Sequence, residues 1–276
     1  MNIVITGASS GIGKGFVNIF TRHGHAVLAT ARRENNLQAL SQEMLEKYNT
    51  EIHTLALDLT LDSAADALFE HAVQTFGKVH MLINNAGMSP YQDFVELNRY
   101  HIHQIISLNI LALTDLCHLF IPHMLDHGEQ SHLVNVGSAG GYAPIPHFSV
   151  YDGSKHYTRI FTNMLCWELR GTNIKVSGVH PGGVLSEFNK LAGQDFKKLA
   201  DLGLMTSDEF AEKTYPAIIK GRRVIVPGGL YKIAVLLGKI LPFPISIRIM
   251  NLVYNLVMDK VEPTYKIEST TNQEKQ

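Results

Sequence analysis

Short apolar, β-branched runs alternate with longer amphipathic stretches along residues 1–190 of this chain. Strands of this length separated by helices predict a parallel sheet, because each crossover helix must bury its apolar side against one face of the sheet. We therefore predict an α/β, doubly wound, seven-stranded parallel sheet with helices on both faces. The strands are expected at residues 2–6, 26–30, 52–57, 79–84, 132–136, 174–179 and 223–226, and the helices near 12–23, 35–48, 62–76, 99–127, 151–170 and 207–220.

Length and composition restrict the class of protein. The chain has 276 residues and a formal net charge of −1, so one domain is expected, at residues 1–227, and nothing in the charge indicates a nucleic-acid partner. Cys117 and Cys166 both lie in helical patterns, so their spacing predicts neither a disulfide nor a metal site. The chain opens on a strand, NIVIT, with no leader pattern. We therefore expect a protein of the reducing cytoplasm.

The segment after this domain is unusually apolar. We expect residues 228–264 to form an apolar helical extension and residues 265–276 to form a polar tail. No apolar run in the extension is long enough to span a bilayer. The interrupting residues are Lys232, Lys239, Pro242, Pro244 and Arg248. The apolar faces must still be buried, so the extension is expected to pack on the domain, on a partner subunit or on a membrane surface as a peripheral contact.

Polar and glycine-rich segments follow the expected strands, where ligands bind in sheets of this kind. The first, TGASSGIG, places Gly7, Gly11 and Gly13 on the turn into the first helix. A backbone without Cβ atoms can approach a pyrophosphate there, and the helix N–H groups and dipole attract the anion. The spacing G-x-x-x-G-x-G departs from the general dinucleotide pattern G-x-G-x-x-G but still indicates a Rossmann-like, nucleotide-binding turn.

A second pattern, YDGSK, places Tyr151 and Lys155 four residues apart in an expected helix. Residues at this spacing share one helix face, with Cβ atoms about 5 to 6 Å apart. A phenol can donate a proton to a carbonyl oxygen that gains negative charge, and a neighbouring ammonium group lowers the pKa of that phenol. The pair is therefore a candidate for acid/base chemistry.

Five motifs in order resemble those of the short-chain dehydrogenase/reductase family. They are TGASSGIG, NNAG at residues 84–87, Ser138 placed 13 residues before Tyr151, the Tyr-x-x-x-Lys pair and PGGV at residues 181–184. The resemblance covers residues 1–190. It implies the single-domain Rossmann fold of that family, and a variable loop at about residues 185–206 that would form a lid over the substrate.

The resemblance also implies a catalytic set of Asn109, Ser138, Tyr151 and Lys155. Tyr151 would be the general acid/base, Ser138 would donate to the substrate oxygen, Lys155 would also hold the nicotinamide ribose, and Asn109 would hold a water linked to Lys155. Asp152 and Gly153 replace the small helix formers usual in the family. We expect neither to touch the reacting atoms, because an acid in a first helical turn is favourable and glycine costs at most about 1 kcal/mol there.

The choice of cofactor depends on the end of the second strand, ATARRENN. Arginine there favours a ribose 2′-phosphate, whereas an acid would favour NAD, so we predict NADP(H) over NAD(H). Arg32 is the expected primary contact, Arg33 a stacking or solvated neighbour, and Glu34 falls too late to be the ribose ligand. The full expected cofactor site is Gly7, Ser9, Ser10, Gly11, Ile12, Gly13, Arg32, Arg33, Asp58, Leu59, Asn85, Ala86, Gly87, Tyr151, Lys155, Pro181, Gly182, Val184 and Ser186, with no metal.

These features predict an NADPH-dependent oxidoreductase that reduces a ketone or aldehyde to an alcohol, reversibly, on an apolar small-molecule substrate. A homodimer or homotetramer is expected. Two alternatives stay open: a nucleotide-binding scaffold or sensor without turnover, and a membrane-associated lipid-metabolic reductase. A catalytic set with every member present disfavours the scaffold. The sequence does not identify the substrate, because fold alone does not determine it.

Overall fold

A parallel sheet of seven strands runs through the computed structural model of the chain, which describes residues 1–90, 92–185 and 204–257. Its spatial order is β3-β2-β1-β4-β5-β6-β9, and every neighbouring pair is parallel. The strands are β1 (Asn2–Thr6), β2 (Ala26–Ala31), β3 (His53–Ala56), β4 (Met81–Asn84), β5 (Ser131–Val136), β6 (Ile174–Val179) and β9 (Val224–Ile225). The predicted strand number and direction are confirmed, and the order reverses between β1 and β4, where ligands bind in such sheets.

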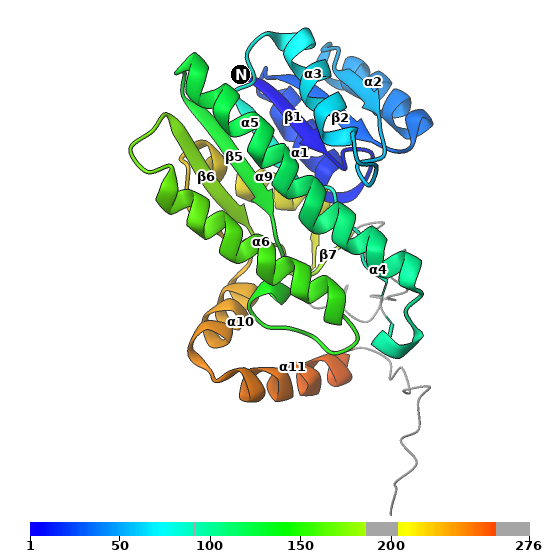
Figure 1. Cartoon of the computed structure of the whole chain (residues 1–276), viewed down its shortest axis with the longest axis vertical. Coiled ribbons are helices and arrows are strands. Elements are labelled where there is room, and N and C mark those ends of the chain that lie inside the picture. The colour runs from blue at the N-terminus through cyan, green and yellow to red at the C-terminus, as the bar shows by residue number, and fades with distance from the viewer. Residues whose placement is uncertain (91, 186–203, 258–276) are drawn as a thin grey trace, which may run out of the picture.

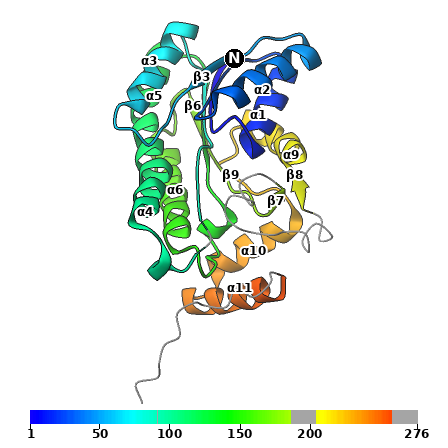
Figure 2. The ribbon, with the colours of Figure 1, turned by 90° about the vertical axis from the view of Figure 1, so that its right-hand side faces the viewer.

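Helices cover both faces of the sheet, as Figure 2 shows nearly edge-on. One face carries α1 (Gly11–Arg22), α2 (Glu34–Tyr48) and α9 (Ser207–Ile219), and the other carries α3 (Ala64–Phe76), α5 (Leu113–His127) and α6 (Ser149–Glu168). Neighbouring residues of β1 point to opposite faces: Ile3 and Ile5 enter the core under α1, whereas Val4 enters the core under α5. The short apolar runs of the sequence are therefore strands buried on both sides, as predicted.

A long helical stretch, Arg99–His127, was expected as one helix. It consists of α4 (Arg99–Ile106), a π-helical segment η2 (Ser107–Ala112) and α5. Its length and composition alone would allow it to cross a membrane. However, Leu116, Phe120 and Met124 of α5 are buried in the core against the sheet, so we assign the stretch to the domain.

Two short 3₁₀ helices complete the domain, η1 (Phe94–Glu96) and η3 (Ala139–Gly141), together with a small sheet of β7 (Val184–Leu185) and β8 (Met205–Thr206). Beyond β9 the apolar extension forms two helices, α10 (Gly229–Ile240) and α11 (Phe243–Val257). Both lie below the carboxyl ends of the strands in Figure 1. The expected lid and polar tail fall almost wholly on residues outside the described ranges.

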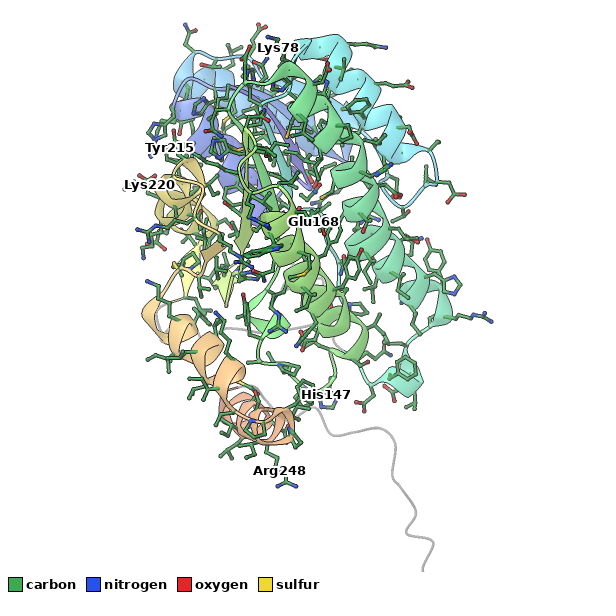
Figure 3. The ribbon with its side chains drawn as sticks, turned by 60° about the vertical axis from the view of Figure 1, so that its left-hand side comes forward. Lys78, His147, Glu168, Tyr215, Lys220 and Arg248 are labelled. Carbon is green, nitrogen blue, oxygen red and sulfur yellow. The ribbon has the colours of Figure 1, made fainter. Side chains whose placement is uncertain are left out.

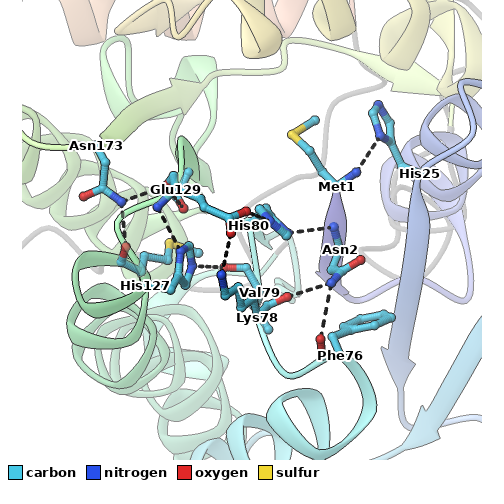
Figure 4. Close-up of polar contacts among 12 residues, drawn as sticks. Met1, Asn2, His25, Phe76, Lys78, Val79, His80, His127, Glu129 and Asn173 are labelled. Atoms are coloured by element: carbon cyan, nitrogen blue, oxygen red, sulfur yellow. Dashed lines mark hydrogen bonds and ion pairs between the residues drawn. The ribbon is translucent and has the colours of Figure 1, made fainter.

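The amino ends of the central strands are joined by a polar network, shown in Figure 4. The Asn2 backbone N–H donates to His80 Nδ1 at 3.1 Å, and His80 Nε2 lies 2.9 Å from a Glu129 carboxylate oxygen. Glu129 also pairs with Lys78, and these hydrogen bonds lower the pKa of its carboxyl to about 2. His80 thus joins the amino ends of the central strands, away from the carboxyl ends where the site is expected.

Candidate active site

A cleft of about 400 Å³ lies at the carboxyl ends of the central strands. It brings together nearly all the predicted site residues, although they lie far apart in the sequence. Its walls are Gly7, Ser9, Ser10, Gly11, Ile12, Ala31, Arg32, Arg33, Leu57, Asp58, Leu59, Asn85, Ala86, Gly87, Leu108, Val136, Gly137, Ser138, Tyr151, Lys155, Pro181, Gly182 and Val184. Among the predicted residues, Gly13 and Asn109 lie behind these walls, and Ser186 lies outside the described residues.

The glycine turn is built around backbone contacts that a side chain would prevent. Gly7 has φ +64° and Gly11 has φ +54°, in the left-handed region that glycine accepts without strain. A Cβ on Gly13 would lie 2.2 Å from the Gly7 carbonyl oxygen. This packing holds the start of α1 against the turn and leaves its N–H groups facing the cleft, which suits a pyrophosphate. The cradle therefore fits a dinucleotide cofactor.

Asn85, which directly follows β4, holds the glycine turn in place through hydrogen bonds. Its Nδ2 donates to the carbonyl oxygens of Thr6 at 2.9 Å and Gly7 at 3.2 Å, while its backbone N–H donates to the Thr6 hydroxyl at 3.0 Å. Asn84 points the other way, into the sheet, where its Nδ2 donates to Asn135 Oδ1 at 3.0 Å. Asn84 therefore ties β4 to β5. Asn85 ties the segment after β4 to the end of β1 and to the glycine turn.

The far end of the cleft carries two arginines after β2. Arg33 precedes α2, and its Nη2 donates to the Ser10 hydroxyl of the glycine turn at 3.2 Å. Arg32 lines the same end. The Glu34 side chain accepts from Gln38 along α2 at 3.3 Å and does not line the cleft. Two guanidinium groups thus line this end of the cleft.

The catalytic candidates meet at the other end. Ser138 follows β5, and a hydrogen bond joins its side chain to that of Tyr151 on α6. The Lys155 ammonium nitrogen lies 5.6 Å from the centroid of the Tyr151 ring and donates to the Val136 carbonyl oxygen at 3.0 Å. Burial lowers the pKa of Lys155 to about 8. The predicted helical face shared by Tyr151 and Lys155 is present, and both side chains reach the cleft.

The pKa of Tyr151 moves in the direction opposite to our expectation. Burial raises it most, the charge of Asp152 raises it further, and the hydrogen bond with Ser138 opposes both. The spacing of Tyr151 and Lys155 indicates the effect of the ammonium group, whereas the cost of placing a phenolate in a buried position depends on tertiary packing. The surroundings of Tyr151 thus raise the pKa of its phenol above the ordinary value.

Asp152 also differs from expectation, because its side chain is not a solvated helix-end charge. It is 4% exposed, and its Oδ2 accepts from the Ile145 backbone N–H at 2.6 Å. Gly140 leaves room for it, since a Cβ there would lie 2.3 Å from Oδ1. Burial raises the pKa of Asp152 to about 7. The sequence signal was the unusual acid directly after Tyr151, together with glycines at 140 and 141.

Asn109 lies in the π-helical segment, behind the wall of the cleft. Its Oδ1 accepts from the Met88 N–H at 3.0 Å, and its Nδ2 donates to the Met88 carbonyl and to the Ser154 hydroxyl. Ser154 in turn donates to the Tyr151 carbonyl oxygen at 2.6 Å. The asparagine therefore links the segment after β4 to the helix that carries Tyr151. A π-helical turn at such a place is common at functional sites.

The comparisons with known proteins agree with this geometry. The short chain dehydrogenase family model matches residues 1–196. The chain belongs to this family.

Among its relatives, sulfoacetaldehyde reductase 2 of Chromohalobacter salexigens is 34% identical over 190 residues, which is 67% of this chain and 73% of that protein. The mouse dehydrogenase/reductase SDR family member 7 is 35% identical over 196 residues, which is 70% of this chain and 58% of that protein. This short-chain dehydrogenase is thus an oxidoreductase with a Rossmann-like fold that uses a nicotinamide cofactor.

Solved structures confirm the fold. A short-chain dehydrogenase from Sphingobium yanoikuyae in complex with NADPH is 30% identical and superposes with a TM-score of 0.77, over 86% of this chain and 92% of that chain. The bulky-bulky ketone specific alcohol dehydrogenase from Comamonas testosteroni is 24% identical, with a TM-score of 0.73 over 98% of both chains.

Among the described residues, no group of three histidine, cysteine, aspartate or glutamate side chains is placed to hold a metal ion.

Proposed function

We propose that this short-chain dehydrogenase is an NADP(H)-dependent reductase that converts a ketone or aldehyde to an alcohol, reversibly, with Tyr151 as general acid/base. The observation that carries the proposal is that Ser138, Tyr151 and Lys155 line one cleft, with the Lys155 ammonium nitrogen 5.6 Å from the centroid of the Tyr151 ring. Two hydroxyls in one cleft suit an oxygen that gains negative charge. The substrate is expected to be a small apolar molecule.

The cofactor, when bound, supplies the hydride. The side chains of this chain then have to donate the proton and stabilise the negative charge on the substrate oxygen. Tyr151, whose pKa is raised by burial, enters the reaction protonated and donates to the new alkoxide. Ser138 donates a second hydrogen bond to the same oxygen.

Lys155 is expected to hold the cofactor ribose and to stabilise negative charge on Tyr151. Its pKa of about 8 means that the side chain remains mostly an ammonium group at neutral pH. Gly87 supports this arrangement, since a Cβ there would lie 3.4 Å from Lys155 Nζ and 3.4 Å from Asn109 Oδ1. The water that we expect at Asn109 would connect Lys155 to solvent.

The preference for NADP(H) rests on Arg32 and Arg33. Two guanidinium groups and the Ser10 hydroxyl lie at the end of the cleft where a 2′-phosphate would be placed, and such groups bind phosphate through charge-assisted hydrogen bonds. Glu34 lies along α2 with Gln38 and does not oppose them. The NADPH complex of the Sphingobium relative is consistent with this choice.

A continuous absorbance assay tests the proposal. NADPH and NADH consumption would be followed across aldehydes and ketones graded by chain length and ring size. Rates that rise with substrate apolarity under NADPH support the reductase, and a preference for NADH contradicts the assignment of Arg32. NADPH binding without turnover of any carbonyl would support the scaffold alternative, which the complete set of Asn109, Ser138, Tyr151 and Lys155 disfavours.

We also infer that the protein self-associates in the cytoplasm, as a homodimer or homotetramer. The outer face of α6 exposes Ile160, Met164 and Trp167, which are spaced four and three residues apart and are 49 to 59% exposed. Leu111 and Leu125 of the neighbouring helical stretch are exposed as well. Apolar side chains at this spacing form a stripe suited to a second copy. Light scattering of the purified chain tests this, and a monomer at all concentrations would contradict it.

A further inference from the structure

The two C-terminal helices expose an unusual number of large apolar side chains. We call these residues the outer α10–α11 surface, and each is between 39 and 69% exposed. They are Leu230, Ile233, Leu236, Leu237, Ile240, Phe243, Ile245, Ile249 and Leu252. Both helices lie at one end of the molecule, outside the layers that cover the sheet (Figures 1 and 2). Contiguous apolar patches of this kind mark interaction sites.

Helix α10 has two distinct sides. Its inner side carries Tyr231, Val235 and Gly238, which pack on the domain. Its outer side carries Leu230, Ile233, Leu237 and Ile240 at spacings of three, four and three, so they form one stripe. A helix that only filled out the domain would present polar residues on that side. The stripe instead needs an apolar partner beyond the described part of the chain.

The charges beside the apolar stripe are all of one sign. Between Gly229 and Val257 the sequence contains Lys232, Lys239 and Arg248 and no aspartate or glutamate. Lys232 and Lys239 are seven residues apart on one flank of α10, although the Lys239 ammonium nitrogen lies 5.1 Å from the centroid of the Tyr142 ring of the domain. Arg248 projects from α11 at the end of the molecule (Figure 3). Apolar residues flanked by cations are typical of helices that lie in the interface of an anionic bilayer.

We propose that the outer α10–α11 surface docks this enzyme on a membrane that contains anionic lipids. Helices of 12 and 15 residues are too short to span a bilayer of about 20 residues per crossing, so they would lie in the headgroup region. A second copy fits this surface less well. A two-fold contact would place the same patch against itself, and Lys232 and Arg248 would find no aspartate or glutamate between Gly229 and Val257 to pair with.

Docking there would bring lipid close to the substrate end of the cleft. Tyr231 of α10 packs on the turn after β6, since Cβ atoms on Gly182 and Gly183 would lie within 2.0 and 2.6 Å of its ring and hydroxyl. Gly238 packs on the Tyr142 carbonyl, in the loop that follows Ser138. The inner side of α10 thus contacts both loops that flank the proposed reaction site. Apolar substrates dissolved in the bilayer would have a short path to it.

Sedimentation with vesicles tests the proposal directly, using the full chain. The vesicles contain phosphatidylcholine alone or equal parts of phosphatidylcholine and phosphatidylglycerol. We expect sedimentation with the anionic vesicles only, and release as NaCl is raised from about 0.1 to 0.5 M. I233Q/L237Q should lower the partition coefficient about tenfold or more, because two apolar side chains no longer enter the acyl boundary. K232Q/R248Q should lower it about tenfold or more on anionic vesicles.

The matched control is L45Q/L61Q. Leu45 is 36% and Leu61 is 62% exposed, close to the 57 and 43% of Ile233 and Leu237, and both lie outside α10 and α11, on α2 and in the turn before α3. The control should sediment like the wild type. The proposal fails if the wild type stays in solution, or if I233Q/L237Q sediments as well as the control. It also fails if light scattering shows that the wild type is a dimer and that the I233Q/L237Q variant is a monomer.

Circular dichroism confirms that each variant is folded, and NADPH titration reports on the cofactor site separately. Because vesicle binding does not depend on turnover, the membrane proposal and the reductase proposal can fail independently.

Discussion

Replacing Asp152 by asparagine should change how the stability of this enzyme depends on pH. The carboxyl is 4% exposed, and burial raises its pKa from 3.8 to about 7, against the hydrogen bond from Ile145. Asparagine keeps an oxygen that can accept from Ile145 and has nearly the same shape, but it cannot ionise. The variant therefore removes the cost of the buried charge and preserves the contact.

The sign and size follow from proton linkage. Between about pH 4 and 7 the folded wild type keeps the Asp152 proton while the unfolded chain has released its own, so the free energy of unfolding falls as pH rises. The loss is about 1.4 kcal/mol per pH unit between the two pKa values. From pH 5 to pH 8 the stability of D152N relative to the wild type should therefore rise by about 2 to 3 kcal/mol.

Urea denaturation of both proteins at half-unit steps of pH measures this difference. D66N is the control, because Asp66 also lies in a first helical turn, that of α3, but is exposed. The stability of D66N relative to the wild type should show no such trend. If D152N and the wild type keep a constant difference from pH 5 to 8, the carboxyl does not carry the burial cost assigned to it, and the reasoning is wrong.

Three further predictions concern the cofactor site and α6. Gly13→Ala should abolish NADPH binding in a fluorescence titration while the protein stays folded, because its Cβ would lie 2.2 Å from the Gly7 carbonyl oxygen. Arg32→Ala should raise the KM for NADPH about tenfold or more and leave that for NADH nearly unchanged, since only the phosphate contact is lost; equal losses for both cofactors would contradict it. Gly153→Ala should stabilise the protein by about 0.5 to 1 kcal/mol in urea, because Gly153 lies in a helix with open space at its Cβ position.

The sheet could be predicted from the sequence because strand and helix periods differ. Both faces of the sheet are covered, so β1 contains the short apolar run Ile3–Ile5, and β1 and β5 are each found within one residue of their predicted ends. The positions of the site residues then follow from topology, since they come directly after parallel strands. The helical form of the extension could be predicted, but what covers its apolar faces could not, because that depends on surfaces that the sequence does not specify.

The electrostatics of the site could not be predicted. The spacing of Tyr151 and Lys155 indicated a shared face correctly, but the pKa of a phenol depends on how much water its folded surroundings exclude. Asp152 shows the same limit. A first-turn acid is usually solvated, and only the loop from Ser138 to Ile145, which folds over it, turns the carboxyl inward. Side-chain burial of this kind is a property of tertiary packing.

The most direct test of the proposed chemistry is the Tyr151→Phe variant, compared with the wild type in two assays. Steady-state NADPH oxidation with the best carbonyl substrate measures turnover, and NADPH fluorescence measures cofactor binding. We expect turnover to fall at least 100-fold, as for loss of a general acid, with the Kd for NADPH changed less than about threefold. A variant that retains a substantial part of the wild-type rate would show that Tyr151 is not the proton donor.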